Sequence, residues 1–258
     1  MIIAVFNVRR FLKYLLILAA AAVLITAFSL TGMNVLGVYS GEKEIPIYSV
    51  EREEKVAAIT FDCAWGADDI PDILSALKTA DIKATFFIVG QWAEKYPDKV
   101  KMIARDGHDV ANHSYSHPHM GGLGGAQNAA ELRDCGRVLE KLAGVKCDLF
   151  RAPYGEYSNS LIQEARHQGY YTIQWDVDSL DWQPGISREE IMNRVQARVR
   201  NGSILLFHND TPHTAKILPA VVSSLKQKGY SFLPVSRMIL REDYSIDHEG
   251  RQRKNTME

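Results

Sequence analysis

The chain has 258 residues, with 30 Lys and Arg against 31 Asp and Glu, and a net charge of -1 at neutral pH. A chain of this length can bury a sizeable core, as one large domain or two small ones. The balanced charge predicts no nucleic-acid partner. Three cysteines are too few for a disulfide framework. Cys135 and Cys147 could pair, but we expect two unpaired buried thiols.

The N-terminal segment differs from the rest of the chain. Arg9, Arg10 and Lys13 precede an uncharged run over residues 14–30, and roughly 20 apolar residues are enough to cross a bilayer. We expect residues 1–38 to form a retained single-pass membrane anchor, with the positive flank in the cytoplasm and the following domain outside the cell membrane. A cleaved signal peptide is the alternative, although the run is long for one and no A-x-A site closes it.

Two polar segments flank the central part of the chain. Residues 39–54 contain one proline and read as a short linker from the membrane to the domain. Residues 241–258 are charged and lack apolar periodicity, which predicts a flexible tail. The domain itself is therefore expected over residues 55–240.

Within the domain, short apolar runs alternate with helical patterns. Residues 68–80 have an acidic start and apolar residues at helical spacing. Strands that alternate with helices predict βαβ units and a parallel sheet, hence an α/β fold. Such units fit a distorted (β/α)7 barrel of the TIM type with one strand missing, or a doubly wound open sheet. The expected strands span 56–62, 84–89, 109–112, 148–151, 170–175, 203–208 and 231–235, and the other expected helices 91–105, 126–143, 159–168, 187–200 and 215–228.

The polar residues at the ends of these strands favour the barrel. In a β/α barrel the C-terminal strand ends converge on one face, where the site is built. Residues far apart in the sequence would then share one pocket. The residues at or just beyond successive strand ends are Asp62, His113, Arg151, Asp178 and His208.

Two histidines lie four residues apart in the stretch NHSYSHPHM. This spacing places His113 and His117 on one side of a helical turn, which suits one divalent metal ion. We interpret the nearby His119 as a surface residue.

Five short motifs occur in a fixed order along the chain. They are TFDCAWG at 60–66, HSYSH at 113–117, RAPYG at 151–155, DSLDW at 178–182 and LLFH at 205–208. With these motifs, residues 56–240 resemble a polysaccharide deacetylase, the NodB homology domain of carbohydrate esterase family 4. The FD-x-x-WG form of the first motif is similar to the sporulation branch of that family, which acts in or near the bacterial spore wall.

The resemblance implies N-deacetylation of an acetylated amino sugar in peptidoglycan or spore cortex. Amide hydrolysis needs an activated water, a group that holds the oxyanion and an acid for the leaving amine. By resemblance, Asp62 is the base and Arg151 keeps it ionised. His208 is the acid, and Asp178 holds it protonated.

The resemblance also implies how the substrate is held. The backbone N–H of Tyr154 would help a metal to hold the oxyanion. Trp182 and Leu206 would form the apolar wall that receives the acetyl methyl group.

The chain departs from the family pattern at Cys63, where most members have a second aspartate that completes an Asp-His-His metal set. A thiolate is a good zinc ligand, so Cys63 could complete a set with His113 and His117. Alternatively the metal is lost, or Asp68 or Asp69 replaces the ligand, which their position at the start of a helix disfavours. We expect a divalent metal, with zinc first.

Two classes of function remain open. The leading hypothesis is a membrane-anchored hydrolase that acts on peptidoglycan or a related N-acetylglucosamine polymer. The second is a catalytically silent, wall-binding domain that keeps the fold but lacks the metal. The retained Asp62, Arg151, Asp178 and His208 favour the hydrolase. A zinc peptidase is disfavoured because no H-E-x-x-H occurs.

Overall fold

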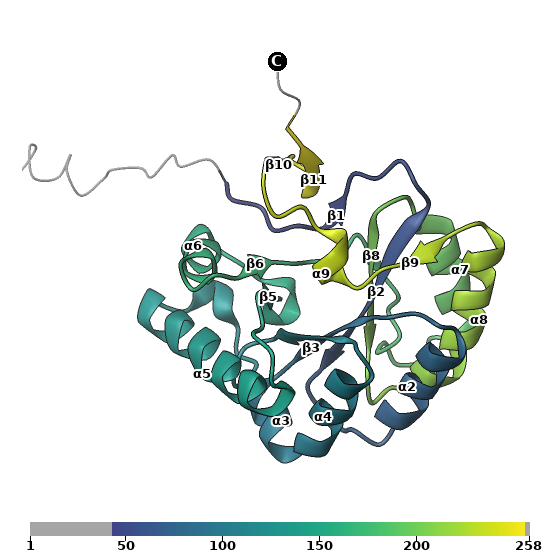
Figure 1. Ribbon diagram of the computed structural model, residues 1–258, viewed down its shortest axis with the longest axis horizontal. Coiled ribbons are helices and arrows are strands. Elements are labelled where there is room, and N and C mark those ends of the chain that lie inside the picture. The colour runs from purple at the N-terminus through teal and green to yellow at the C-terminus, as the bar shows by residue number, and fades with distance from the viewer. Residues whose placement is uncertain (1–42, 256–258) are drawn as a thin grey trace, which may run out of the picture. The chain divides into compact units, whose positions relative to one another are not determined.

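The computed structural model describes residues 43–255, so the predicted anchor over residues 1–38 lies outside the described part. No helix among the described residues is both long and apolar enough to cross a bilayer. Residues 44–255 belong to one compact unit (Figure 1).

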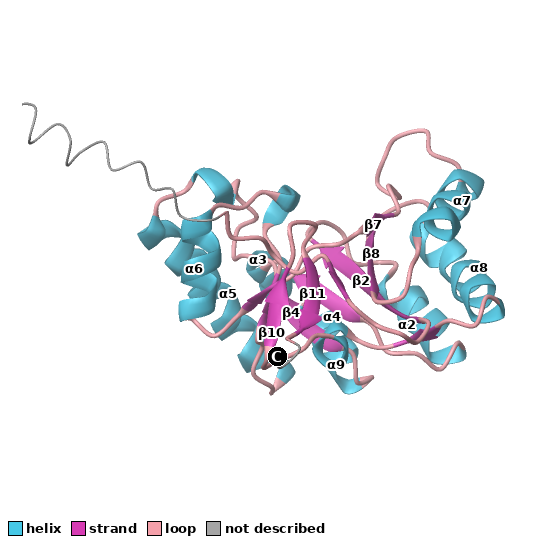
Figure 2. Ribbon diagram, turned by 90° about the horizontal axis from the view of Figure 1, so that it is seen from above, coloured by secondary structure: helices cyan, strands magenta, loops and turns pink. Residues whose placement is uncertain are grey.

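A mostly parallel sheet, curved into an incomplete barrel, occupies the centre of this unit (Figure 2). Its longest strand, β2 (Val56–Cys63), is buried along its whole length, as a central parallel strand covered on both faces should be. β8 (Ser203–His208) pairs with one side of β2. The other side is followed in order by β3 (Thr85–Ile88), β4 (Asp109–Asn112), β5 (Leu149–Phe150) and β6 (Tyr171–Thr172). Two short strands lie off this path: β7 (Val177–Asp178) pairs with β8, and β9 (Ser231–Phe232) pairs with β2.

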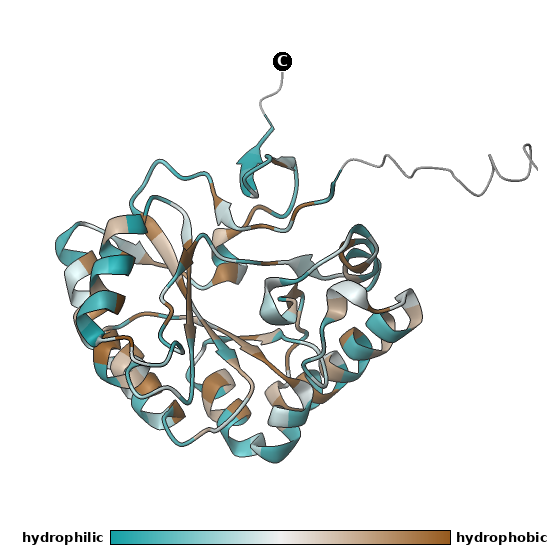
Figure 3. Ribbon diagram, turned by 180° about the vertical axis from the view of Figure 1, so that it is seen from behind, coloured by the Kyte–Doolittle hydropathy of each residue, from teal (hydrophilic) through white to brown (hydrophobic). Residues whose placement is uncertain are grey.

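Helices surround the sheet in the predicted alternation (Figure 1). The expected helix over 91–105 is divided at Pro97. A proline disfavours helical backbone angles at the residue before it, and Tyr96 accordingly has φ -127° and ψ 54°. Figure 3 shows hydrophobic residues on the strands and on helix surfaces that face them. The helices are α2 (Ile70–Thr79), α3 (Gly90–Lys95), α4 (Pro97–Arg105), α5 (Gly125–Ala143), α6 (Asn159–His167), α7 (Arg188–Arg198), α8 (Thr214–Gln227) and the short α9 (Val235–Met238).

The expected linker over residues 39–54 is partly a strand of the barrel, so that prediction is wrong for its second half. β1 (Ser49–Val50) pairs antiparallel with β8. Just before it, Ile47 forms a parallel bridge with Ile173, which follows β6. Ile47 and Val50 are buried in the core. This segment therefore bridges β6 and β8, and its burial explains why it is ordered.

The expected flexible tail is also folded. β10 (Tyr244–Ile246) and β11 (Arg251–Lys254) form an antiparallel hairpin, and β11 pairs in parallel with β1. Gln252 of β11 is fully buried, and its side-chain amide donates to the Leu240 carbonyl and accepts from the Leu240 N–H, both at 2.8 Å. The strand shows no apolar periodicity because its buried side chain is polar.

We expect Gln252→Ala to lower the free energy of unfolding by about 1–3 kcal/mol, because the Leu240 N–H and C=O lose their partners. Arg253→Ala is the matched control on the same strand. Its ion pairs with Asp247 and Glu51 are partly exposed, so we expect a loss of about 1 kcal/mol or less. Chemical denaturation of the full-length protein in detergent measures both values. Equal losses in the two variants would show that the Gln252 amide does not fasten the hairpin.

The three cysteines are unpaired and buried. The Cys135 and Cys147 thiols each point to a backbone carbonyl oxygen, of Ile88 and Leu149 respectively, at 3.4 Å. The prediction of two unpaired buried thiols at these positions is confirmed.

Candidate active site

Side chains from the C-terminal ends of several strands line one cavity of about 490 Å³. Asp62 of β2 and His208 of β8 are paired positions in the parallel ladder, so the register places them side by side. Eight of the ten predicted site residues line the cavity. Of the other two, Arg151 lies beneath it and Cys63 lies elsewhere. Its lining residues are Asp62, Ala64, Trp65, His113, His117, Tyr154, Trp175, Asp178, Trp182, Leu206 and His208.

Asp62 is held by a buried arginine. The Arg151 guanidinium is 0% exposed and donates to Asp62 Oδ1 at 2.6 Å, to Thr60 Oγ1 at 2.9 Å and to the Gln174 carbonyl at 3.1 Å. It also lies 3.9 Å from the centre of the Phe87 ring. These contacts fix the direction of the Asp62 carboxylate. The family resemblance implied the pairing of Asp62 with Arg151, and the structure supplies its geometry.

The charge of this pair keeps Asp62 ionised. Burial acts to raise the pKa of Asp62, but the positive charge of Arg151, followed by His113 and His208, holds that pKa below its usual range. A carboxylate that is ionised at neutral pH and faces a cavity can accept a proton from a water molecule there.

The two predicted histidines lie together, although not on a helical turn. Their ring centres are 5.0 Å apart, and residues 113–119 form an irregular loop. Ser114 and His117 have positive φ of 65° and 59°. The carboxylate of Glu131 in α5 accepts hydrogen bonds from the Tyr115 and Ser116 N–H groups at 2.8 Å and holds the loop in place. The prediction of a helical turn is therefore wrong.

Both imidazoles are neutral near pH 7. His113 Nδ1 lies 2.8 Å from the Arg151 carbonyl, which can only accept, so Nδ1 carries the proton and Nε2 carries the lone pair. Burial lowers the pKa of His113. Burial, followed by the charge of His113, lowers the pKa of His117 to about 4. His113 Nε2 faces Asp62 Oδ2 at 3.5 Å, so two acceptors are opposed and a water or a cation between them would satisfy both.

His208 is held by Asp181, so the prediction that Asp178 is its partner is wrong. Asp181 is buried, and its Oδ1 lies 2.8 Å from His208 Nδ1 while its Oδ2 accepts from the His208 backbone N–H at 2.8 Å. Asp178 lines the cavity, but its Oδ1 accepts from the Leu180 N–H at 2.9 Å and shapes the turn. Both aspartates occur in the DSLDW motif, and only their directions in space distinguish them.

Asp181 also sets the charge of His208. Burial acts to lower the pKa of His208, but the hydrogen bond and charge of Asp181 outweigh it, and the pKa is raised. A protonated imidazole in the same cavity as Asp62 is a suitable general acid.

We expect Asp181→Asn to shift the alkaline limb of the pH–rate profile to lower pH. A general acid works below its own pKa, and removing the Asp181 charge lowers the pKa of His208. The maximal rate should fall by about 10²-fold. Acetate release from an N-acetylglucosamine oligomer at a series of pH values measures both effects. Asp178→Asn is the matched control and should move the limb less. An unmoved limb in Asp181→Asn would show that His208 is not the acid.

Cys63 does not join the two histidines. β2 continues through Cys63, and because side chains alternate along a strand, Cys63 shares a face with Phe61 rather than with Asp62. Both pack in the core cluster that contacts the outer helices, and Cys63 is 0% exposed. Burial, followed by the charges of Asp62 and Asp69, raises the pKa of the thiol well above its usual value. The prediction of Cys63 as a metal ligand is therefore wrong for this geometry.

The cavity offers an incomplete donor set for a metal ion. His113 and His117 provide two imidazoles, but no group of three His, Cys, Asp or Glu side chains arranged to hold a metal occurs within residues 43–255. Asp69, one of the two substitute ligands considered with Asp68, accepts from the Asp210 N–H at 2.9 Å instead. The residues therefore do not fit the complete three-ligand site that the resemblance led us to expect.

The apolar wall of the cavity is made by Trp182, Leu206 and a residue that the sequence did not indicate, Trp175. The sequence did offer one signal for Trp175, because it ends the run expected as a strand over 170–175.

Backbone strain is concentrated around the cavity. Tyr154 has a positive φ of 60°, and five of the seven non-glycine residues with positive φ in the described part belong to loops at this end of the sheet. Such strained residues gather at functional sites. The five are Ser114, His117, Tyr154, Leu180 and Asp210.

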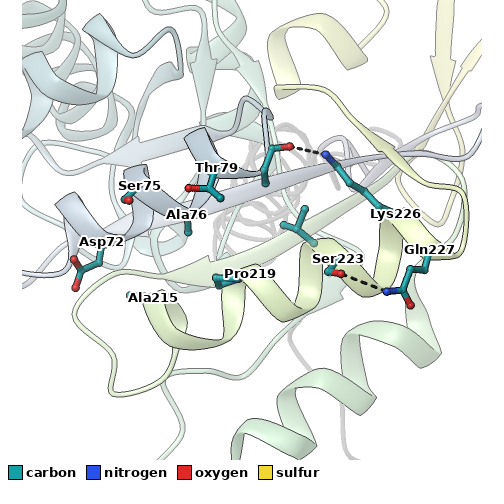
Figure 4. Close-up of a pocket in the computed structure, with 11 residues that line it drawn as sticks. Asp72, Ser75, Ala76, Thr79, Ala215, Pro219, Ser223, Lys226 and Gln227 are labelled. Atoms are coloured by element: carbon teal, nitrogen blue, oxygen red, sulfur yellow. Dashed lines mark hydrogen bonds between the residues drawn. The ribbon is translucent and has the colours of Figure 1, made fainter.

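A larger cavity lies away from this chemistry. It measures about 720 Å³ and lies between α2 and α8 (Figure 4). Small side chains such as Ala76 and Ser223 line it, and Lys226 at one end donates to the Ala80 carbonyl. It contains no acid and base arranged for catalysis, so the smaller cavity at the strand ends is the candidate active site.

Comparison with known proteins defines the class. A family model described as polysaccharide deacetylase matches residues 49–173. The chain is 34% identical over 202 residues to the peptidoglycan-N-acetylglucosamine deacetylase of Bacillus cereus, covering 76% of this chain and 73% of that protein. The chain belongs to the polysaccharide deacetylase family, as its five motifs predicted.

Its relatives include active and inactive members. A solved carbohydrate esterase family 4 pseudoenzyme from Bacillus anthracis has a TM-score of 0.73 and 30% identity, covering 81% of this chain and 73% of that one. A mutant of that pseudoenzyme with restored enzymatic activity has a TM-score of 0.72 and 33% identity, covering 75% and 70%. The protein YlxY of Bacillus subtilis is 32% identical over 75% of this chain, which spans 60% of that relative's length.

Proposed function

We propose that the chain is an N-deacetylase that hydrolyses the acetamido group of an amino sugar in peptidoglycan. One observation carries the proposal: Asp62, oriented by Arg151, and His208, oriented by Asp181, face the same cavity. Relatives named as peptidoglycan deacetylases support the substrate class.

The proposed reaction uses the two groups in turn. Asp62 takes a proton from a water molecule, whose oxygen attacks the acetamido carbonyl carbon. The backbone N–H of Tyr154 donates to the oxyanion that forms. His208 gives its proton to the amide nitrogen, and the C–N bond breaks to leave acetate and a free amine. The methyl group lies against Trp182 and Leu206.

The proposal assigns no step to a metal ion. Family members are metal-dependent deacetylases in general, and zinc is the metal that imidazole ligands suit. In this chain zinc would find only His113 and His117 among the described donors. Two imidazoles bind a metal less firmly than the usual three protein ligands of a catalytic zinc site.

We propose also that residues 1–38 anchor the protein in the cell membrane. The domain would then lie outside the cytoplasm, where peptidoglycan is found. The FD-x-x-WG motif supports a place at the spore wall in a spore-forming cell. Cell fractionation with an antibody to the domain tests the anchor, and a protein released entirely into the soluble fraction would contradict it.

A silent wall-binding domain is the second candidate function. The incomplete metal donor set and the pseudoenzyme among the relatives favour it. The two functions differ in one respect: a binding domain holds the glycan without changing it.

The test combines binding with turnover. Full-length protein in detergent is incubated with the N-acetylglucosamine pentamer and with purified peptidoglycan. Mass spectrometry measures loss of acetyl groups, and calorimetry measures binding. We expect acetate release with formation of free amines. Binding of either glycan without acetate release would contradict the deacetylase and support the silent wall-binding domain.

A further inference from the structure

Exposed aromatic side chains border the candidate active site. The large hydrophobic residues exposed in the described part are Trp65 (57%), Tyr154 (55%), Trp182 (52%) and Val145 (58%). The three aromatic ones all line the catalytic cavity. Exposed apolar surface that is gathered in one place indicates a binding surface. Tyr154 and Trp182 have proposed roles in the reaction, but Trp65 has none.

Trp65 lies between the catalytic cavity and a second one. Ala64 and Trp65 line both cavities. The second cavity measures about 450 Å³, and its other lining residues are Gly66, Gln91, Trp92, Lys95 and Tyr96. The hollow that contains Asp62 therefore continues past the indole toward α3.

The backbone next to Trp65 is held firmly. The Gly66 N–H donates to Asp210 Oδ2 at 2.9 Å, and the Gly66 carbonyl accepts from the Trp92 indole N–H at 2.9 Å and from the Asn209 amide. A Cβ atom at position 66 would lie 2.4 Å from the Asp210 carboxylate, so a larger residue would disturb this arrangement. An exposed side chain on a fixed backbone loses little freedom when it binds a ligand.

The contact between Trp65 and His117 does not account for the tryptophan. Their rings meet edge to face with centres 5.7 Å apart. More than half of the Trp65 side chain stays exposed despite that contact.

We propose that Trp65 is a stacking platform for the sugar next to the one being deacetylated, with the glycan strand continuing into the second cavity. A pyranose ring has an apolar face of C–H groups that can cover an indole, and hydroxyl groups around its edge. Gln91 and Lys95 lie where they could donate to that edge. This inference rests on the proposed function for its substrate class. It predicts an enzyme that reads at least two sugars of the strand.

The test compares the N-acetylglucosamine pentamer with the single sugar by calorimetry, with the full-length protein in detergent. Native protein should bind the pentamer about ten-fold more tightly than the single sugar, which cannot reach Trp65 from the catalytic cavity. Trp65→Ala should lose about that ten-fold for the pentamer and keep its affinity for the single sugar. Trp65→Phe retains a stacking ring and should keep most of the difference. Val145→Ala, an equally exposed position away from the cavity, is the matched control and should bind as the native chain does.

The outcomes separate this inference from the proposed function. Equal affinity of the native protein for the pentamer and the single sugar, or an unchanged pentamer affinity in Trp65→Ala, would overturn the platform. An equal loss for both ligands would also overturn it, since Trp65 would then contact the sugar being deacetylated. Length-dependent binding without acetate release would support the platform and remove the deacetylase. Circular dichroism of each variant shows that it is folded.

Discussion

Asp62→Asn is expected to reduce acetate release by about 10²–10⁴-fold, the usual contribution of a positioned general base. An amide cannot accept the proton of the attacking water. The substitution keeps the size of the side chain and leaves an oxygen that can still accept from Arg151. The fold should therefore persist, although the buried guanidinium loses its anionic partner and the free energy of unfolding falls by about 3–5 kcal/mol.

The measurement is acetate release from the N-acetylglucosamine pentamer, with thermal unfolding to show that the variant is folded. Asp178→Asn is the matched control, because it makes the same change in the same cavity and leaves Asp62, Arg151 and His208 in place. In the native protein, activity should persist into mildly acidic solution, because the lowered pKa keeps Asp62 ionised. Native rates in Asp62→Asn would mean that another group activates the water.

Cys63→Asp is expected to increase both metal content and turnover. A carboxylate cannot remain unpaired in the apolar core without a large cost, so it should turn from the end of β2 toward His113 and His117. Those three residues would form the donor set that the family resemblance led us to expect. A bound divalent metal stabilises a tetrahedral oxyanion by several kcal/mol, so the rate should rise by about 10²-fold or more. The restored activity of a mutant pseudoenzyme among the relatives shows that a family member can regain catalysis.

Cys63→Ala is the control for the sulfur atom. The structure buries the thiol away from the histidines, so this variant should keep the native metal content and rate and lose about 1 kcal/mol of stability. Metal analysis of the purified variants after incubation with Zn²⁺ or Co²⁺ measures the first quantity. Release of metal by Cys63→Ala would show that the thiolate is a ligand after all. No gain of metal in Cys63→Asp would show that this strand end cannot turn toward the histidines.

Much of the site could be predicted because its residues occur in short motifs at strand ends. The alternation of apolar runs and helical patterns predicted a parallel sheet, and a parallel sheet brings the ends of its strands to one edge. Asp62, His113 and His208 could therefore be assigned to one cavity without coordinates. The family could be identified from the order of the motifs, because five motifs in one order at strand ends are far more specific than any one of them.

The partner of His208 could not be chosen from the sequence. Asp178 and Asp181 are the same residue type in one motif, and the turn between them decides which carboxylate meets the imidazole. Trp65 was visible in the first motif, but its exposure beside a second cavity depends on how the loops of β2 and β8 are joined. The sequence does not show the direction of the Asp178 and Asp181 side chains or the exposure of Trp65.

The remaining differences concern pairing over long distances. The sequence by itself determined the local elements, since periodicity and proline positions act over a few residues. Only the tertiary structure decided that β2 runs through Cys63, which turns the thiol into the core, and that β1 and β11 join the sheet. A strand's end and its neighbours depend on hydrogen bonds with segments far away in the sequence, such as β1 with β11, where Ser49 pairs with Arg251. A short strand whose buried residue is polar, like Gln252, leaves no hydrophobic pattern by which to recognise it.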